Sequence, residues 1–211
     1  MLTNAKTVLF IGAHPDDEFA CSATLAKLVD SGVDIHMVYF SICEDIVPPG
    51  FDKNVRISEI NEAVKILGVS KDNLYLYTFP VRRLEENKLD IRQRMHEIGQ
   101  RVKPNLVLTP SRFDVHQDHK AITEEAIRVF KFKSILGYEM VHNNFGSNYN
   151  YFVSISDQHL SKKILSIAKH VSENFRKYFD PELIEALARV RGLQAGVDLA
   201  EAFELIKMVE D

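Results

Sequence analysis

Two short stretches of this sequence carry side chains that bind metal ions and move protons. Residues 14–18 read His-Pro-Asp-Asp-Glu, and residues 114–119 read Asp-Val-His-Gln-Asp-His. Imidazole and carboxylate groups are the usual nitrogen and oxygen ligands of catalytic zinc. A carboxylate or imidazole that binds no metal can instead accept or donate a proton during hydrolysis. These residue types therefore indicate metal-assisted catalysis, provided that the fold brings the two stretches together.

Three of these residues have the types and spacing of a catalytic metal site. His14 and Asp17 are three residues apart across a predicted helix start, so both side chains can point at one ion. His119, from the second stretch, can supply a third ligand. Two imidazoles and one carboxylate, with a position left for water, are typical of catalytic zinc, and iron or nickel could use the same ligands. The sequence has no Cys-x-x-Cys pair, which removes the common structural-zinc interpretation.

The neighbours of these ligands are candidates for proton transfer. Asp16 is adjacent to a ligand, and its carboxylate can deprotonate a water molecule. Asp118 could orient His116 and favour its cationic form, placing a donor where an oxyanion develops or where a leaving amine needs a proton. Alternatively, His116 and His119 are two surface histidines on a polar loop whose aspartates form turns and caps. The presence of both stretches in one chain favours catalysis.

Each stretch directly follows a predicted strand. Residues 7–11 and residues 106–109 are short apolar runs that contain β-branched side chains, as buried strands do. Open α/β sheets bind their ligands at the carboxyl ends of the strands, so stretches about 100 residues apart can converge there. Gly12 stands alone at the first turn, so the G-x-G-x-x-G pattern of a dinucleotide site is missing.

The rest of the chain continues an alternation of strands and helices. Further strands are predicted at 33–42, 74–79, 135–141 and 151–155, helices at 19–31, 55–67, 91–102, 119–130, 161–178 and 181–193, and an apolar element of undetermined type at 200–209. This order predicts an α/β fold, a single Rossmann-like domain over residues 1–211 with a mostly parallel sheet and helices on both faces. Residues 43–54 contain Pro-Pro-Gly and form a loop long enough to be an active-site lid.

Composition favours a globular protein of the cytoplasm. The 211 residues are 45% hydrophobic and 27% charged, with a net charge of −4 and no basic run that would bind nucleic acid. No segment has the roughly 20 apolar residues of a membrane span, and residues 1–6 show no secretory signal. Cys21 and Cys43 lie in or beside apolar runs, which predicts reduced thiols.

In combination, the two histidine-containing stretches resemble the LmbE/PIG-L family of zinc-dependent N-acetylglucosaminyl deacetylases. The resemblance extends over nearly the whole chain: residues 56–68 resemble the family's R-x-x-E-x-x-x-A…LG helix, residues 163–172 its K…H-x-S-Q segment, and residues 191–203 its closing motif. Glu173 stands where the family usually has Gln, at a position expected near the pocket rim or a subunit contact.

The resemblance implies a role for each residue of the site. It implies that His14, Asp17 and His119 bind Zn²⁺, or another divalent transition metal, and that Asp16 is the general base. It also implies a homo-oligomer and a Rossmann-like α/β fold. The substrate implied is a small molecule, the N-acetyl derivative of a glucosamine-type sugar or sugar conjugate.

Further roles follow from the same resemblance. His116, tuned by Asp118, would stabilise the tetrahedral intermediate or protonate the departing amine, and Arg56 would contact the substrate. From the residues alone, Arg56 could equally be an exposed arginine paired with Glu59. Two alternatives to the deacetylase are an amidase acting on a larger thiol-sugar conjugate and a non-catalytic metal-binding protein. The non-catalytic alternative leaves the presence of Asp16 and His116 unexplained.

Overall fold

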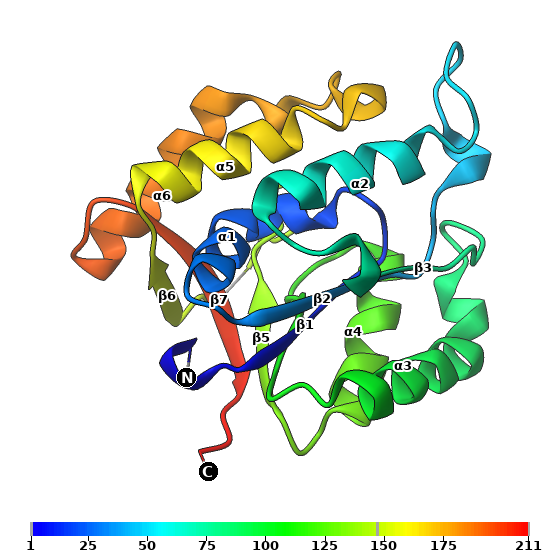
Figure 1. Ribbon diagram of the computed structural model, residues 1–211, viewed down its shortest axis with the longest axis horizontal. Coiled ribbons are helices and arrows are strands. Elements are labelled where there is room, and N and C mark those ends of the chain that lie inside the picture. Colours follow the sequence, from blue (N-terminus) through cyan, green and yellow to red (C-terminus); the bar gives the residue numbers. More distant parts are fainter. Residues whose placement is uncertain (1, 147, 211) are drawn as a thin grey trace.

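The computed structural model describes residues 2–146 and 148–210, and its centre is a seven-stranded sheet in the order β3-β2-β1-β4-β5-β7-β6 (Figure 1). The strands are β1 (Thr7–Gly12), β2 (Asp34–Tyr39), β3 (Leu74–Leu76), β4 (Leu106–Pro110), β5 (Ser134–Tyr138), β6 (Tyr151–Ser154) and β7 (Ala200–Lys207). Strands β1 to β5 pair in parallel, whereas β7 is antiparallel to both β5 and β6. The predicted mostly parallel α/β sheet is confirmed.

Helices cover both faces of the sheet (Figure 1). One face carries α1 (Ser22–Asp30), α2 (Val55–Leu67), α5 (Asp157–Ile167) and α6 (Pro181–Ala195), and the other carries α3 (Lys88–Val102) and α4 (Gln117–Val129). Strand β1 is buried on both sides, because Phe10 packs into the first apolar cluster while Leu9 and Ile11 pack into the second. A central strand of this kind is a rigid support for the residues that follow it.

The two polar stretches leave the sheet side by side. Strand β1 pairs in parallel with β4, with Val8 opposite Leu106 and Phe10 opposite Leu108. The chain order reverses between these two strands, which is where open α/β sheets form their ligand-binding crevice. The predicted convergence of residues 14–18 with residues 114–119 is therefore confirmed.

The first helix begins later than predicted. Pro15 does not open an α-helix; a turn and a 3₁₀ helix at Asp17–Ala20 come first, and α1 begins only at Ser22. The cause is Asp17, whose Oδ2 accepts the backbone N–H groups of Ala13 at 2.7 Å and His14 at 3.0 Å. These bonds fold the chain back on itself and present the polar side chains at the end of β1.

The helix predicted at 161–178 is also shorter than expected. Helix α5 ends at Ile167, and residues 168–180 contain two 3₁₀ turns, Val171–Glu173 and Lys177–Phe179. Ser172 anchors this segment, since its N–H and Oγ both donate to the buried carboxylate of Glu59 at 2.7 Å. The strand predicted at 74–79 likewise ends at Leu76, and the undetermined element at 200–209 is strand β7.

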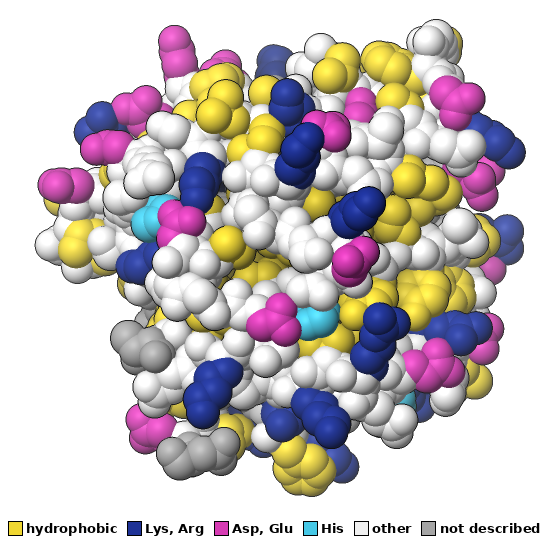
Figure 2. All heavy atoms as spheres, viewed as in Figure 1, with side chains coloured by type: hydrophobic (Ala, Val, Ile, Leu, Met, Phe, Trp, Pro, Cys, Tyr) yellow, Lys and Arg dark blue, Asp and Glu magenta, His cyan; other side chains and the backbone are white. Residues whose placement is uncertain are grey.

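Other predictions agree with the structure. Helix α2 has the predicted bounds, and Gly68 ends it in the left-handed region with φ of +82°. Cys21 and Cys43 are buried free thiols. Within the described ranges, no helix combines the length and apolar character that a membrane crossing requires. Lys and Arg side chains are mixed with Asp and Glu over the face seen in Figure 2.

Gly192 allows α6 to pack closely against the chain that follows it. A methyl group at this position would lie 2.7 Å from the carbonyl oxygen of Val197 and still closer to that of Asp198. We expect Gly192→Ala to lower the free energy of unfolding by about 1–3 kcal/mol, measured by urea denaturation. Leu193→Ala, at the exposed neighbouring position, is the control and should change it by less than about 0.5 kcal/mol. Equal effects of the two variants would contradict the packing argument.

Candidate metal and catalytic site

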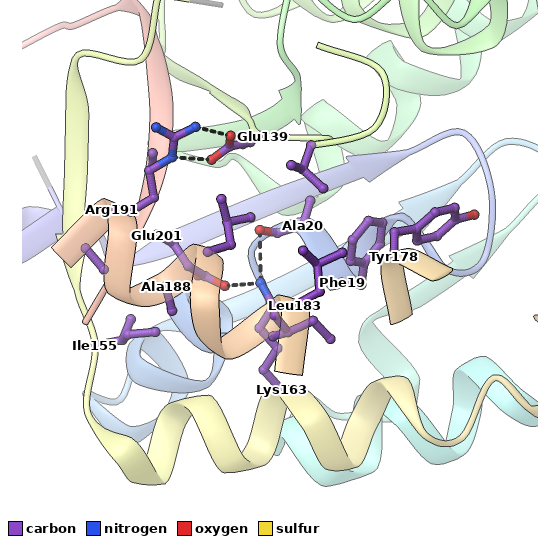
Figure 3. A pocket seen from close by; sticks show the side chains of 15 residues that line it. Phe19, Ala20, Glu139, Ile155, Lys163, Tyr178, Leu183, Ala188, Arg191 and Glu201 are labelled. Atoms are coloured by element: carbon purple, nitrogen blue, oxygen red, sulfur yellow. Dashed lines mark hydrogen bonds and ion pairs between the residues drawn. The ribbon is translucent and has the colours of Figure 1, made fainter. Parts of the chain in front are cut away.

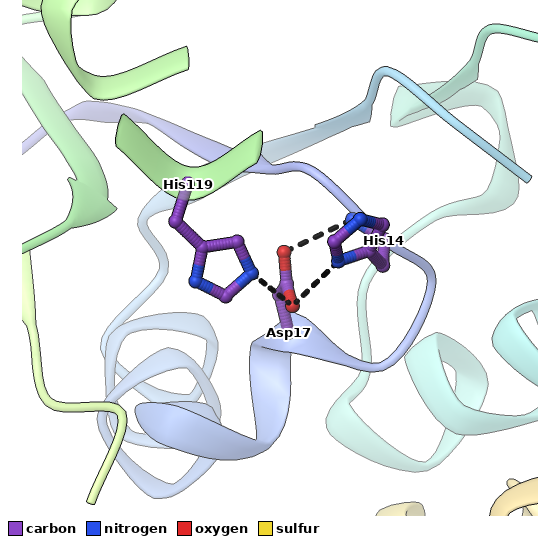
Figure 4. A group of neighbouring side chains, drawn as sticks. All are labelled: His14, Asp17 and His119. Carbon is purple, nitrogen blue, oxygen red and sulfur yellow. Dashed lines mark hydrogen bonds and ion pairs between the residues drawn. The ribbon is translucent and has the colours of Figure 1, made fainter. Parts of the chain in front are cut away.

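His14, Asp17 and His119 lie together at the carboxyl ends of β1 and β4, with Asp17 between the two rings (Figure 4). Oδ1 of Asp17 is 3.7 Å from Nδ1 of His14 and 3.2 Å from Nε2 of His119. One ligand atom from each residue lies within 4.8 Å of the other two. The three side chains are nearly buried, so their polar atoms depend on one another rather than on solvent.

Hydrogen bonds orient both imidazoles toward the same point. Nδ1 of His119 is 2.6 Å from Oδ2 of Asp114, so this nitrogen carries a proton, and Nε2 is the ring atom that can bind a cation in place of its own proton. Nε2 is buried and makes no hydrogen bond within the described residues, although Oδ1 of Asp17 lies 3.2 Å away. On the other side, Nε2 of His14 contacts Asp118 at 3.0 Å, and its Nδ1 faces Asp17. A divalent cation fits between these atoms.

The electrostatics of the site also favour a positive charge at this point. Burial lowers the pKa of His119, but the Asp17 and Asp114 carboxylates outweigh burial and raise it to about 10. Burial likewise opposes a charge on His14, and Asp118 and Asp17 raise its pKa to about 9. Although burial alone would raise the pKa of Asp17, the two imidazoles hold it well below its usual range. The pocket therefore stabilises positive charge, which protons or a metal cation can supply.

Asp16 lies beside the ligands and faces the same cavity. This cavity has a volume of about 220 Å³, and its walls include His14, Asp17, His116 and His119. Burial and the negative charge of Asp17 raise the pKa of Asp16 to about 6. Asp16 is outside the group of three convergent ligand atoms. Its position suits a carboxylate that exchanges a proton with a molecule in the cavity.

The prediction that the Asp118 carboxylate orients His116 is wrong. His116 is the N-cap of α4, and its Nδ1 accepts the backbone N–H of Asp118 at 3.1 Å. Burial and the positive charges of His119 and His14 lower the pKa of His116 to about 4, so the ring is neutral rather than cationic. Because Nδ1 accepts a hydrogen bond, the single ring proton is on Nε2, where a neutral imidazole is still a donor.

The Asp118 carboxylate supports a different histidine. Its Oδ2 contacts Nε2 of His14 and accepts the N–H of Arg82 at 2.6 Å, while Oδ1 accepts the N–H of Leu84 at 3.2 Å. The reason is geometric: once His116 caps the helix, the side chain two positions later points toward the loop before α3. Asp118 thus connects that loop to His14.

Asp114 is the site residue that sequence reasoning missed, since it was considered only as a turn or cap residue. It is fully buried; Oδ2 contacts Nδ1 of His119 at 2.6 Å, and Oδ1 accepts the N–H of His116 at 2.8 Å. Carboxylates that bond to ligand histidines fix the ring and raise its basicity. The signal in the sequence was an aspartate five residues before a candidate ligand.

We expect Asp114→Asn to weaken binding of a divalent metal by about 10- to 100-fold, because the amide has no negative charge and its single oxygen cannot accept from both His119 and the His116 N–H. Competition against a chromophoric chelator measures this affinity. Asp90→Asn, at an exposed position in the first turn of α3, is the matched control and should bind metal as the unmodified protein does. An unchanged affinity for Asp114→Asn would show that the contact with His119 has no orienting role.

Arg56 is buried rather than exposed, and its partner is not Glu59. Its side chain extends from α2 to Glu173, a residue 117 positions away, and only 5% of Arg56 is accessible to solvent. The second oxygen of Glu173 accepts Nε of Arg176 at 2.7 Å. Both arginines and Glu173 line the 220 Å³ cavity, so the predicted position of Glu173 at the pocket is confirmed.

Another, much smaller cavity lies under α6, and the side chains beside it stabilise the fold (Figure 3). Its volume is about 20 Å³, enough for a single water molecule. Beside it, Lys163 pairs with Glu201 at 2.6 Å and donates to the carbonyl of Ala20. Glu201 also accepts the N–H groups of Ala23 and Thr24 at the start of α1. This buried network holds the segment that follows the candidate metal ligands of the first stretch.

The sequence of this chain is similar to those of known proteins. The sequence model of the family PIG-L, described as GlcNAc-PI de-N-acetylase, matches residues 9–130. The uncharacterized deacetylase YaiS of Escherichia coli K12 is 29% identical over 174 residues, which cover 79% of this chain and 91% of that protein.

Two solved structures share the fold. The N,N'-diacetylchitobiose deacetylase from Pyrococcus horikoshii has a TM-score of 0.81 at 23% identity, covering 96% of this chain and 84% of that one. GalB, the 4-carboxy-2-hydroxymuconate hydratase from Pseudomonas putida KT2440, has a TM-score of 0.79 at 18% identity, covering 98% and 99%. Because these two proteins catalyse different reactions, their likeness shows the fold alone, and the reaction has to be argued from residues.

Proposed function

Since the chain belongs to the PIG-L family of deacetylases, we propose that it is a metal-dependent hydrolase of N-acetylglucosamine-type amino sugars or their conjugates. It removes the acetyl group from the sugar nitrogen and releases acetate and a free amine. The observation that carries this proposal is the meeting of His14, Asp17 and His119 at one point, with Asp16 beside them in the same cavity.

The metal, which we propose to be zinc, would be held by His14, Asp17 and His119, with Nδ1 of His14 and Nε2 of His119 facing the Asp17 carboxylate. When bound there, it supplies a positive charge that polarises the attacking water and the amide carbonyl. Asp114 and Asp118 hold the two imidazoles in place through their other nitrogens. Other divalent transition metals fit the same donor set.

Asp16 and His116 carry out the proton chemistry. The Asp16 carboxylate takes a proton from water as the water oxygen forms a bond to the amide carbon. His116, as a neutral imidazole, donates a hydrogen bond from its Nε2–H to the oxyanion that develops. The proton held on Asp16 then passes to the sugar nitrogen as the carbon–nitrogen bond breaks. Water and amide are consumed, and one acetate and one amine are formed.

The rest of the cavity is suited to a sugar ring. Tyr178 stacks on His142 with the ring centroids 3.9 Å apart, and both residues line the cavity. Flat aromatic surfaces of this kind pack against the apolar faces of ligands. Arg56 also lines the cavity, and its buried Nε has no hydrogen-bond partner within residues 2–146 and 148–210, which supports a role in binding an oxygen of the substrate.

Release of acetate and primary amine from a panel of N-acetylglucosamine derivatives tests this function. The protein is assayed loaded with zinc and after removal of zinc by a chelator, and we expect release only from the loaded protein. Release from a thiol-sugar conjugate alone would favour an amidase of larger substrates. Tight zinc binding without release from any compound would favour a non-catalytic metal-binding protein.

A cytoplasmic location and a homo-oligomeric state stay predictions. Light scattering coupled to size-exclusion chromatography gives the mass of the particle in solution. A mass close to the 24.1 kDa of one chain would contradict the predicted oligomer.

A further inference from the structure

Three arginines line the cavity that contains the metal site, and they come from three separate segments. Arg56 belongs to α2, Arg82 to the loop before α3, and Arg176 to the segment after α5. Within residues 2–146 and 148–210, Glu173 is the one carboxylate that forms ion pairs with any of them. The lining of the cavity also includes the carboxylates of Asp16, Asp17 and Glu173. Asp17 faces the imidazoles of His14 and His119, and Glu173 pairs with Arg56 and Arg176, so among the described residues Arg82 is the one guanidinium of the three that has no carboxylate partner.

Among the three arginines, Arg82 gives the clearest evidence of a ligand-binding role. Its backbone has φ of +66°, in the left-handed region that glycine adopts more easily than any other residue. The N–H bond to Asp118 holds this conformation, and it needs no side chain. The guanidinium is exposed, and within the described ranges it has no hydrogen bond or ion pair. An arginine at a position suited to glycine, with a free cationic end at the cavity, indicates a ligand-binding role.

Glu173 prepares the other two arginines. Each of its carboxylate oxygens accepts from one guanidinium, from an Nη of Arg56 and from Nε of Arg176. Glu173 is only 1% exposed, so its carboxylate is held in place by the surrounding chain and fixes the positions of the two arginine side chains. The single negative charge of Glu173 balances only one of the two positive charges on Arg56 and Arg176. The Nη groups of Arg176 and the buried Nε of Arg56 stay free to donate.

We infer that the natural substrate carries an anionic group, a carboxylate or a phosphate, attached to the acylated amino sugar. This inference rests on the proposed function, which places the acylated nitrogen at the metal. The anionic group binds Arg82 and Arg176 at the wall of the cavity. Guanidinium groups present paired donors in a plane and match carboxylate and phosphate oxygens in geometry as well as in charge.

Three compounds that differ mainly in one substituent test the inference. They are the methyl glycoside of N-acetylglucosamine, which is neutral, its carboxymethyl glycoside, and N-acetylglucosamine 1-phosphate. We expect kcat/KM of the zinc-loaded protein to be about 10- to 100-fold higher for at least one anionic compound than for the methyl glycoside. The better of the two anionic compounds distinguishes carboxylate from phosphate.

Arg82→Gln and Arg176→Gln should each lower the ratio of kcat/KM for the anionic compound to that for the methyl glycoside by about tenfold. Arg83→Gln is the matched control. Arg83 is the next residue in the chain, is also exposed to solvent, and pairs with Glu86 instead of lining the cavity. This control should keep the ratio of the unmodified protein.

Outcomes for the inference and for the proposed function are separable. Equal kcat/KM for the three compounds, or a preference for anions that Arg82→Gln leaves intact, would overturn the inference and leave the deacetylase standing. If no compound releases amine, the proposed function fails. Calorimetric titration with carboxymethyl glucosaminide, the expected amine product, then still tests the anion site: tighter binding to the unmodified protein than to Arg82→Gln supports it, and equal binding overturns it.

Discussion

Replacement of His119 by alanine is expected to abolish tight binding of a divalent metal and, with it, the deacetylase activity. The variant loses one of the three proposed ligands, and the remaining pair, His14 and Asp17, offers too few donors for a catalytic metal site. The loss of affinity should exceed the roughly 10- to 100-fold expected for Asp114→Asn, which removes only the support of the same ring. Elemental analysis of the purified variant and competition with a chelator measure the effect.

His96→Ala is the matched control for this variant, because His96 is an exposed histidine on α3 that does not line the cavity. His119→Gln is a second variant for the case in which alanine leaves the buried Asp114 without a partner and the protein does not fold. The amide of glutamine can donate to that carboxylate. A purified, folded His119 variant with a full complement of metal would remove His119 from the ligand set.

The position of the site was predictable because it depends on the sheet. Apolar runs at residues 7–11 and 106–109 were sufficient to indicate strands, and parallel strands end at one edge. Their pairing in the structure brings His14 and His119 together, with ring centroids 5.3 Å apart. Local pattern and general topology therefore settled which residues meet.

The support of each ligand was not predictable, because it depends on a choice between equivalent groups. Asp114 and Asp118 are both near His116 and His119 in the chain. Which carboxylate supports which ring depends on where α4 begins and on His116 capping it. The partner of Asp118 proved to be His14, 104 residues away, and no spacing rule in the sequence encodes such a pair.

The path of residues 168–180, which contribute to the lining of the cavity, could not be predicted either. Apolar residues in this segment continue the spacing of helix α5, which led to the prediction of one long helix. Buried polar contacts decide the actual path, since Ser172 bonds to Glu59 and Glu173 to Arg56 on helix α2. Each of these contacts crosses more than a hundred residues. Hydrophobic periodicity therefore gave the wrong length where polar side chains determine the backbone.

Asp16→Asn is expected to lower kcat by about 10²- to 10⁴-fold while the protein keeps its metal. Asparagine has nearly the same shape as aspartate, but its amide cannot accept a proton from the attacking water. Asp16 is not among the three convergent ligand atoms, so metal content should equal that of the unmodified protein. Acetate release under saturating substrate and elemental analysis of the same sample provide the two measurements.

Stability separates a loss of catalysis from a loss of folding in this variant. Burial and the charge of Asp17 disfavour the carboxylate of Asp16, as its raised pKa of about 6 shows. The neutral amide avoids this unfavourable charge, so the metal-free variant should be at least as stable to heat as the unmodified protein. If Asp16 is a catalytic base whose charge destabilises the fold, its replacement by asparagine lowers turnover without lowering the melting temperature. Near-normal kcat in a metal-loaded Asp16→Asn protein would assign the base to another residue.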